Sequence, residues 1–168
     1  AEWFRKDPSF DASIVRRFGS TLAQALDGEL AAWDQAPSTM LAHVIVLDQF
    51  TRNAWRDSAR AFAGDARALA LARALVERGW DRQLPPLQRW FAYLPYEHAE
   101  DLASQQESLR LFDALARDDP ALADAAVWAR RHQEVIARFG RYPHRNALLG
   151  RASTATELLY LQQPGAGF

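Results

Sequence analysis

The chain has 168 residues, of which 49% are hydrophobic, and its 20 basic residues nearly balance 21 acidic ones. It contains no cysteine, which excludes disulfides, thiolate catalysis and cysteine-based zinc sites. The net charge of −1 argues against general electrostatic binding of nucleic acid or acidic membranes. The length suits one compact domain, residues 1–168. The longest apolar run, Met40–Leu47, is too short to cross a bilayer, and no signal peptide is visible, so we expect a cytoplasmic protein.

Helix signals fill the first half of the chain. Asp7 and Pro8 have the residue types of an N-cap and a first helical position, and Gly28 suits a helix end. Apolar residues recur three or four positions apart after the start signals. The predicted helices run from Pro8 to about Gly28, from Pro37 to about Trp55, and from Ala66 to Arg78.

The second half of the chain continues this pattern. Pro95 should end the first helix there, because proline disrupts a helix interior. The predicted elements are a short helix from Pro86 to about Leu94, long helices from about His98 to Arg117 and from Pro120 to Phe139, and a last helix at the capping box Thr154–Glu157. No stretch alternates with period two and is rich in β-branched residues. The sequence therefore predicts an all-α fold of antiparallel helical hairpins.

Two opposite charges lie on the apolar face of the second predicted helix. That face, followed in steps of three or four residues, consists of Leu41, Val44, Ile45, Asp48, Arg52 and Trp55. A buried pair such as Asp48 and Arg52 is either an internal brace or the floor of a pocket with an anchored guanidinium. We favour the brace for Asp48. We favour the pocket for Arg52 and Asn53, which lie nearer the helix end.

A second cluster lies where the helix beginning near His98 is predicted. Glu97 and Asp101 are one turn apart beside His98, which shares a stripe with Leu102 and Gln105. The helix dipole favours acidic residues in a first turn, which is a sufficient structural reason for them. The alternative is acid–base chemistry by the histidine, or a hard cation held by the two carboxylates. The spacing does not match a two-histidine zinc motif, and we expect no resident metal and no cofactor.

The helix before Gly140 also has a histidine on its apolar face. His132 lies on a stripe with Trp128 and Phe139. A lone histidine in such a position is more often a satisfied core residue than a ligand. Because His132 shortly precedes the loop Arg141–Asn146, it is nevertheless a second candidate base.

The loop after Gly140 carries the densest group of hydrogen-bond donors. Gly140 suits a left-handed turn, and Pro143 restricts the preceding residue to extended conformations. The loop contains no acidic residue. Its donors are Arg141, His144, Arg145 and Asn146. Such donors suit a bound carboxylate or phosphate. The alternative is that Arg145 and Asn146 tie the loop to Asp48, Glu97 or helix carbonyls.

Five segments, taken in order, resemble a known family. They are Trp3–Pro8, Leu47–Asn53, Tyr93–Asp101, Arg138–Asn146 and Gly150–Thr154. Together they are similar to the bacterial family catalogued as domain of unknown function 924, and the match runs through essentially the whole chain. The resemblance implies an all-helical, tetratricopeptide-like array without an established activity. It also implies a further short aromatic helix before Ala1. Thr51, Tyr96 and Tyr142 depart from the family's common residues without removing a charge.

The leading functional hypothesis is a pocket between helices that binds a small anionic molecule or a short peptide. The anionic group would contact Arg52, Arg145 and Asn146. Hydrogen bonds or proton transfer would come from Glu97, His98, Asp101 and His132, with His98, His132 and Glu97 the candidate catalytic groups. Hydrolysis or proton transfer fits these residues best, although the sequence does not require an enzyme.

The competing hypothesis is a non-enzymatic protein-interaction module whose buried polar cluster is purely structural. RNA binding through the Arg141–Arg145 loop is a weaker third hypothesis, because the near-neutral net charge opposes it. No membrane contact is expected, and no sequence feature sets an oligomeric state.

Overall fold

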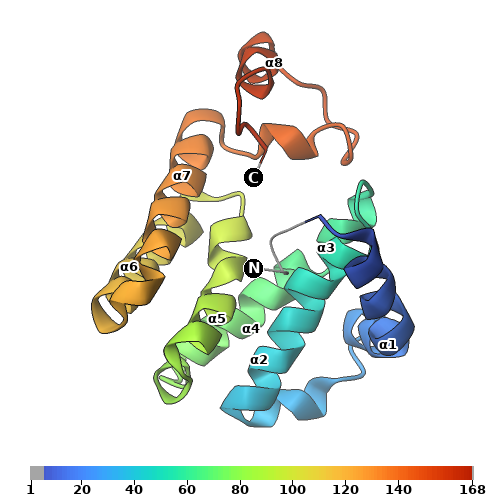
Figure 1. Ribbon diagram of the computed structural model, residues 1–168, viewed down its shortest axis with the longest axis vertical. Helices are drawn as coiled ribbons and strands as arrows, with labels where there is room; N and C mark the ends of the chain where they lie inside the picture. The colour runs from blue at the N-terminus through green and yellow to red at the C-terminus, as the bar shows by residue number, and fades with distance from the viewer. Residues whose placement is uncertain (1–5, 168) are drawn as a thin grey trace.

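Helices make up the architecture of the computed structural model, which describes residues 6–167 (Figure 1). The α-helices are α1 (Pro8–Asp27), α2 (Pro37–Ile45), α3 (Thr51–Ala54), α4 (Asp65–Glu77), α5 (Pro86–His98), α6 (Leu102–Asp118), α7 (Ala123–Phe139) and α8 (Ala155–Leu161). Short 3₁₀ turns lie at Ala31–Gln35, Ala59–Phe62, Asp81–Gln83, Pro120–Leu122 and Pro143–Arg145. Within residues 6–167 there is no strand, and the all-α prediction is confirmed. No helix in this part of the chain is long and apolar enough to span a membrane.

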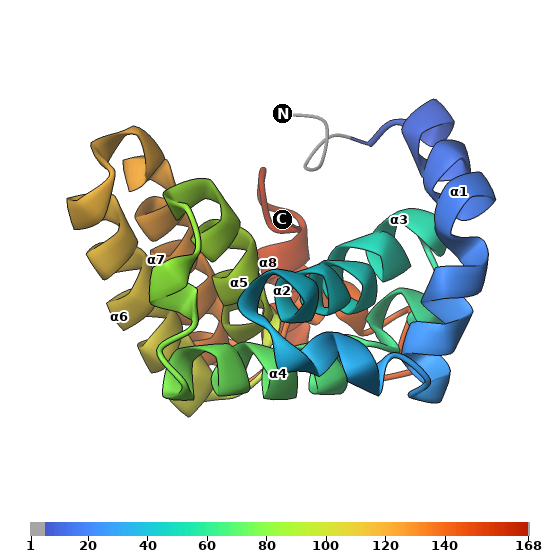
Figure 2. The ribbon, with the colours of Figure 1, turned by 90° about the horizontal axis from the view of Figure 1, so that it is seen from below.

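The helices form a curved row (Figure 2). α6 and α7 pack against each other at one end, and α5 packs on both of them. α2 and α4 pack together in the middle, and α1 lies at the other end against α3. The segment after α7, with the turn Pro143–Arg145 and α8, lies between the ends of α7 and α3 in the view of Figure 1. This segment therefore faces helices from both halves of the chain.

Several helix ends are those that the sequence predicts. The Asp7 carboxylate accepts hydrogen bonds from two backbone N–H groups in the first turn of α1, and Gly28 ends that helix with a φ of 87°. Gly140 ends α7 with a φ of 69°. Thr154 and Glu157 form the predicted capping box of α8. The family motif residues 3–5, and any helix before Ala1, lie outside the described residues.

The helix boundary predicted near Pro95 is wrong. α5 continues through Pro95 to His98, and the next helix begins only after Asp101, its N-cap. A proline inside a helix removes one backbone donor. All residues from Ala92 to Glu97 are buried, and we attribute the continuation to the apolar surface buried in this turn.

The corrected boundary changes the faces predicted for this region. Glu97 and Asp101 belong to different helices, so their predicted one-turn relation is wrong. Leu102, predicted on the inward stripe, is 48% exposed. The buried face of α6 includes Gln105, as the stripe predicted, together with Ser108 and Phe112.

The predicted second helix is continuous but irregular. A π-helical segment, Val46–Phe50, joins α2 to α3 without a break. All five of its residues are buried, so the helix is enclosed on every side here rather than amphipathic. The segment contains Asp48, one of the two charges on the predicted stripe. π-Helical turns inside α-helices frequently lie at functional sites.

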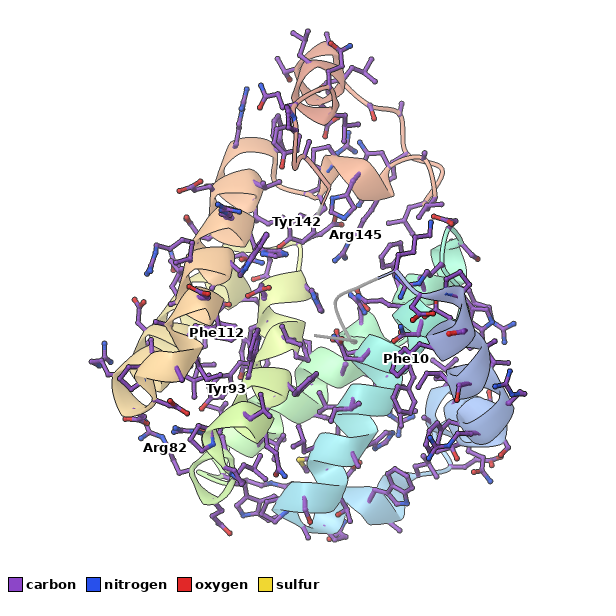
Figure 3. The ribbon with its side chains drawn as sticks, in the orientation of Figure 1. Phe10, Arg82, Tyr93, Phe112, Tyr142 and Arg145 are labelled. Atoms are coloured by element: carbon purple, nitrogen blue, oxygen red, sulfur yellow. The ribbon has the colours of Figure 1, made fainter. Side chains whose placement is uncertain are left out.

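The hydrophobic core fixes the two helices that carry the candidate histidines. Tyr93 of α5 and Phe112 of α6 meet edge to face, with ring centroids 5.8 Å apart (Figure 3). A smaller cluster of Val135, Ile136 and Tyr142 joins the end of α7 to the following loop. Because α5 and α7 both pack on α6, their relative positions are set by buried contacts.

Replacing Gly64 by alanine should destabilise the fold. A Cβ at this position would lie well inside van der Waals contact with the Leu47 carbonyl group of the π-helical segment. Overpacking of this kind costs about 1–3 kcal/mol, because backbone must move. Urea unfolding measures the loss. Gly19→Ala in α1 is the control, since its Cβ meets nothing within 4 Å and should stabilise the helix by about 0.5–1 kcal/mol. Equal effects of the two changes would contradict the close contact.

Candidate functional site

A cleft of about 670 Å³ lies where α3, α5, α7 and the turn Pro143–Arg145 meet. Seven of the eleven predicted site residues line it: Arg52, Asn53, Glu97, His98, His132, His144 and Arg145. Its apolar wall comes from Ala61, Phe62, Trp90, Leu94, Trp128, Tyr142 and Leu148. Lys6, Gln49, Arg56 and Asp57 complete the lining. The cleft thus combines an aromatic wall with a convergent group of polar side chains.

Asp48 lies behind the cleft wall and orients His98. Its carboxylate, which is 1% exposed, is 2.7 Å from Nδ1 of His98 and also accepts a hydrogen bond from Gln49. Burial opposes its charge, but Arg52 and His98 hold the pKa of the Asp48 carboxyl well below its usual range. An ionised carboxylate needs a donor, so Nδ1 of His98 carries the proton. Nε2 is then the unprotonated nitrogen of the neutral ring.

Asp65 joins two arginines at the cleft. Arg52 donates to both of its carboxylate oxygens, at 2.8 and 3.0 Å, and Nη1 of Arg145 lies 3.3 Å from one of them. Arg52 also lies 3.3 Å from Asp48. Two guanidinium groups and two carboxylates therefore alternate along one line of contacts, from the π-helical segment to the loop after α7.

Arg145 is held between two aromatic rings. Its guanidinium carbon is 4.7 Å from the ring centroid of Phe62 and 4.6 Å from that of Tyr142. Tyr142 and Arg145 extend side by side from the loop after α7 toward the helices (Figure 3). Arg145 is only 6% exposed, and its buried Nε has no hydrogen-bond partner among residues 6–167. Burial and the neighbouring Arg52 lower its pKa.

The end of α5 is fixed by side chains from outside that helix. Gln105 of α6 donates to the carbonyl groups of Glu97 and Ala99, each at 2.8 Å. The Tyr142 hydroxyl donates to the same Glu97 carbonyl. These bonds satisfy carbonyl groups that a helix end leaves without partners. They also fix the backbone that carries Glu97 and His98 into the cleft.

Glu97 and His132 form a second buried pair. Nδ1 of His132 donates to the Trp128 carbonyl at 2.9 Å and lies 3.3 Å from the Glu97 carboxyl. Burial lowers the pKa of His132 to about 3 and raises the pKa of Glu97 to about 8, with the Asp48 charge adding to the second shift. At neutral pH, His132 is thus a neutral ring with Nδ1 protonated, and Glu97 is a neutral acid. The other carboxyl oxygen of Glu97 has no hydrogen-bond partner within the described chain.

His98 and His132, two of the three histidines in the cleft, both have a hydrogen-bonded Nδ1. The ring centroids of His98 and His132 are 6.4 Å apart. Burial lowers the pKa of His98, and the charge of Arg52 lowers it further despite the opposing Asp48. His98 therefore has its Nδ1 proton bound by Asp48 and presents Nε2 as a base at neutral pH, and the Nδ1 proton of His132 is likewise bound by the Trp128 carbonyl. His144, also in the cleft, has its pKa lowered to about 4 by burial and by Arg145.

Three predicted site residues point to other partners. Asp101 caps α6 through Ser104, as the helix-end interpretation expects. Arg141 forms a two-point ion pair with Glu157. Asn146 bonds to Arg151 and Ser153. Of the four donors predicted in the loop, only His144 and Arg145 therefore lie in the cleft, while Arg141 and Asn146 hold the loop's shape.

Sequence reasoning missed Asp65 and the aromatic wall. Asp65 is the first residue of α4, where an acid is ordinary because of the helix dipole. Helical spacing had already placed Trp128 one turn before His132. Leu94 precedes His98 in the same way, so the same spacing could have placed it beside that histidine. Phe62 carries no such signal, since the turn that holds it lies far from the histidines in sequence.

No group of three or more histidine, aspartate and glutamate side chains within residues 6–167 is arranged to hold a metal ion. The sequence reading considered Glu97 and Asp101 as ligands of a hard cation. The two residues lie on separate helices, and Asp101 is engaged as a cap.

Residues 1–165 match the family described as bacterial protein of unknown function, DUF924. The chain belongs to this family. Comparison with curated proteins gives no match. The structure is similar to that of ATU0120, a protein of unknown function from Agrobacterium tumefaciens, with a TM-score of 0.89 and 36% sequence identity. The similarity covers 96% of this chain and 89% of that one. The DUF924 assignment confirms the resemblance and carries no activity with it.

Glu97→Gln should become increasingly more stable than the parent as pH rises from 4.5 to about 8. Across this window the folded parent keeps a proton on Glu97 that the unfolded chain releases. Its unfolding free energy therefore falls with pH, by up to about tenfold per pH unit in the unfolding equilibrium constant. Glutamine has no such proton to lose. Urea unfolding at several pH values measures the difference, and Glu134→Gln reports the loss of an exposed carboxyl on α7. Parallel pH profiles for Glu97→Gln and the parent would show that Glu97 is ionised in the fold.

Proposed function

We propose that this DUF924 protein binds a small anionic molecule or a short peptide in the cleft between α3, α5 and α7, and carries out hydrolytic or proton-transfer chemistry on it. The observation that carries the proposal is the buried guanidinium of Arg145, whose Nε has no partner in the described chain. An unpaired buried donor costs about 1–3 kcal/mol. A ligand oxygen at this position would recover that cost.

The environment of Arg145 supports an anion at this point. The rings of Phe62 and Tyr142 both pack close to the guanidinium, which limits the directions from which a ligand can approach it. An arginine edge matches the paired oxygens of a carboxylate or a phosphate. Asp65 takes only Nη1, at the long distance of 3.3 Å. Nε has no partner among the described residues.

The neighbouring acid and base support chemistry on the bound molecule. His98, oriented by Asp48, presents an unprotonated Nε2, and Glu97 is a protonated acid with one unpartnered oxygen. A positioned general base and a positioned general acid can each transfer a proton to or from a bound molecule. His132 is the second base, fixed through the Trp128 carbonyl. These groups suit removal and return of a proton, or activation of a water molecule.

A protein-interaction module is the second candidate function. It is favoured by the extent to which the polar groups satisfy one another, since Asp48 and Asp65 are both paired with Arg52. The family resemblance implies a tetratricopeptide-like array of hairpins, and the packing of α5, α6 and α7 in sequence order supports that arrangement as a proposal. In this view the cluster is only a brace, and no small molecule occupies the cleft.

Thermal shifts across a panel of small organic anions should identify ligands that stabilise the parent but not Arg145→Lys. Lysine keeps the charge but cannot present two parallel donors. A ligand at 100 times its dissociation constant stabilises a protein by about 2.7 kcal/mol, which is readily measured. The matched control is Arg141→Lys, from the same loop, whose arginine binds Glu157 outside the cleft. The control should respond like the parent. Equal shifts in the parent and in Arg145→Lys would place the anion elsewhere, and the absence of any shift would favour the brace.

If a ligand from this panel is also a substrate, its turnover rate should depend on pH in a bell-shaped curve. The rate should rise as His98 loses its proton below pH 6.5, since its pKa is lowered from that value, and fall above about pH 8 as Glu97 ionises. NMR of the ligand measures the rate. His98→Gln should still bind the ligand while its turnover falls at least about a hundredfold, the usual contribution of such a base. Unchanged turnover in this variant would remove His98 from the chemistry.

A further inference from the structure

The donors, charges and apolar wall of the cleft bear on which class of anion it would bind, an inference that rests on the function proposed above. The Arg145 guanidinium donates from Nη1 to Asp65. Its Nε and Nη2 donate no hydrogen bond to any of the described residues. Nε–H and one Nη2–H are parallel in any guanidinium, so they form a two-point edge. Two oxygens held by one atom, as in a carboxylate or a phosphate, match this edge.

The balance of charge around the cleft favours a single negative charge. Arg52 and Arg145 are offset by Asp48 and Asp65. Arg56 pairs with Asp11 outside the cleft. Lys6 and Asp57 form an exposed pair 3.4 Å apart. A monoanion adds one charge to a balanced site, whereas a dianionic phosphate adds a second charge close to the buried Asp48 and the half-buried Asp65.

The apolar wall sets the rest of the ligand. On α5, Trp90 and Leu94 occupy the two turns before His98, and on α7 Trp128 occupies the turn before His132. The polar groups therefore follow the apolar ones along both helices. At 1.5 Å per residue, the eight steps from Trp90 to His98 span about 12 Å. A ligand that reaches from Arg145 along this wall has an apolar body of several carbon atoms.

We propose that the cleft binds an amphipathic monocarboxylate, with its carboxylate on the Nε–Nη2 edge of Arg145 and an aryl or alkyl body against Trp90, Leu94 and Trp128. The carboxylate supplies acceptors to donors that have none in the described chain. The body removes apolar surface from water, which contributes roughly 25 cal/mol for each Å² buried. Charge and shape together exclude small inorganic anions and neutral analogues as good ligands.

Calorimetric titration with a matched set of probes tests this proposal on the unaltered protein. The set is 4-phenylbutyrate, its neutral amide, butyrate and phenyl phosphate. We expect 4-phenylbutyrate to bind at least about tenfold more tightly than each of the others, because only it has both a carboxylate and an aryl body. A tenfold ratio corresponds to about 1.4 kcal/mol. Arg145→Lys should lose this binding, and Arg141→Lys should keep it.

Trp128→Ala tests the apolar wall, and at 44% exposed this side chain can be removed without opening the core. The variant should weaken 4-phenylbutyrate and leave butyrate unchanged. Tighter binding of phenyl phosphate or butyrate would overturn the monocarboxylate class but leave an anion site standing. Equal binding of the amide would overturn both this inference and the anion anchor. If no probe binds, the amphipathic class is wrong, and the anion panel with Arg145→Lys decides the proposed function separately.

Discussion

The buried carboxylate of Asp48 is the constraint on which the rest of the cleft depends. An ionised carboxylate removed from water costs several kcal/mol unless donors replace its hydration. Here Gln49, Arg52 and His98 supply those donors. Since His98 ends α5 whereas the others lie on the α2–α3 helix, the charge is satisfied only when these helices stand in one register. The same charge retains the Nδ1 proton of His98 and raises the pKa of Glu97.

If the proposed function holds, brace and pocket are two aspects of one network. From Asp48 the contacts continue through Arg52 and Asp65 to Arg145. Each internal member is bound on two sides, which is the property of a brace. Arg145, at the end of the line, is bound on one side and has donors left over. The network thus positions an arginine edge without flexible side-chain motion, so less conformational entropy is lost when a ligand binds.

Local signals in the sequence account for much of the fold and for part of the site. Caps such as Asp7 and Gly140 act within one turn of chain, so they could be predicted without knowledge of the packing. The passage of α5 through Pro95 could not, because it depends on buried neighbours from other helices. The pairing of Asp48 with Arg52 was predicted from helical spacing alone. The ion pair of Arg141 with Glu157 was not predicted from the sequence, because Glu157 lies sixteen residues away and is brought near only by the folded loop.

In the proposed function, binding of an anion at Arg145 would also change the basicity of His98. In the free protein, the charge of Arg52 helps to keep His98 neutral, and burial adds to this effect. A carboxylate bound at Arg145 would introduce a negative charge into the same poorly solvated space, where charges interact more strongly than in water. That charge favours the protonated form of His98 and so makes Nε2 a stronger base. It also makes Glu97 harder to ionise. If a carboxylate is bound as proposed, Nε2 of His98 would be a stronger base than in the empty cleft, and Glu97 would stay protonated to a higher pH.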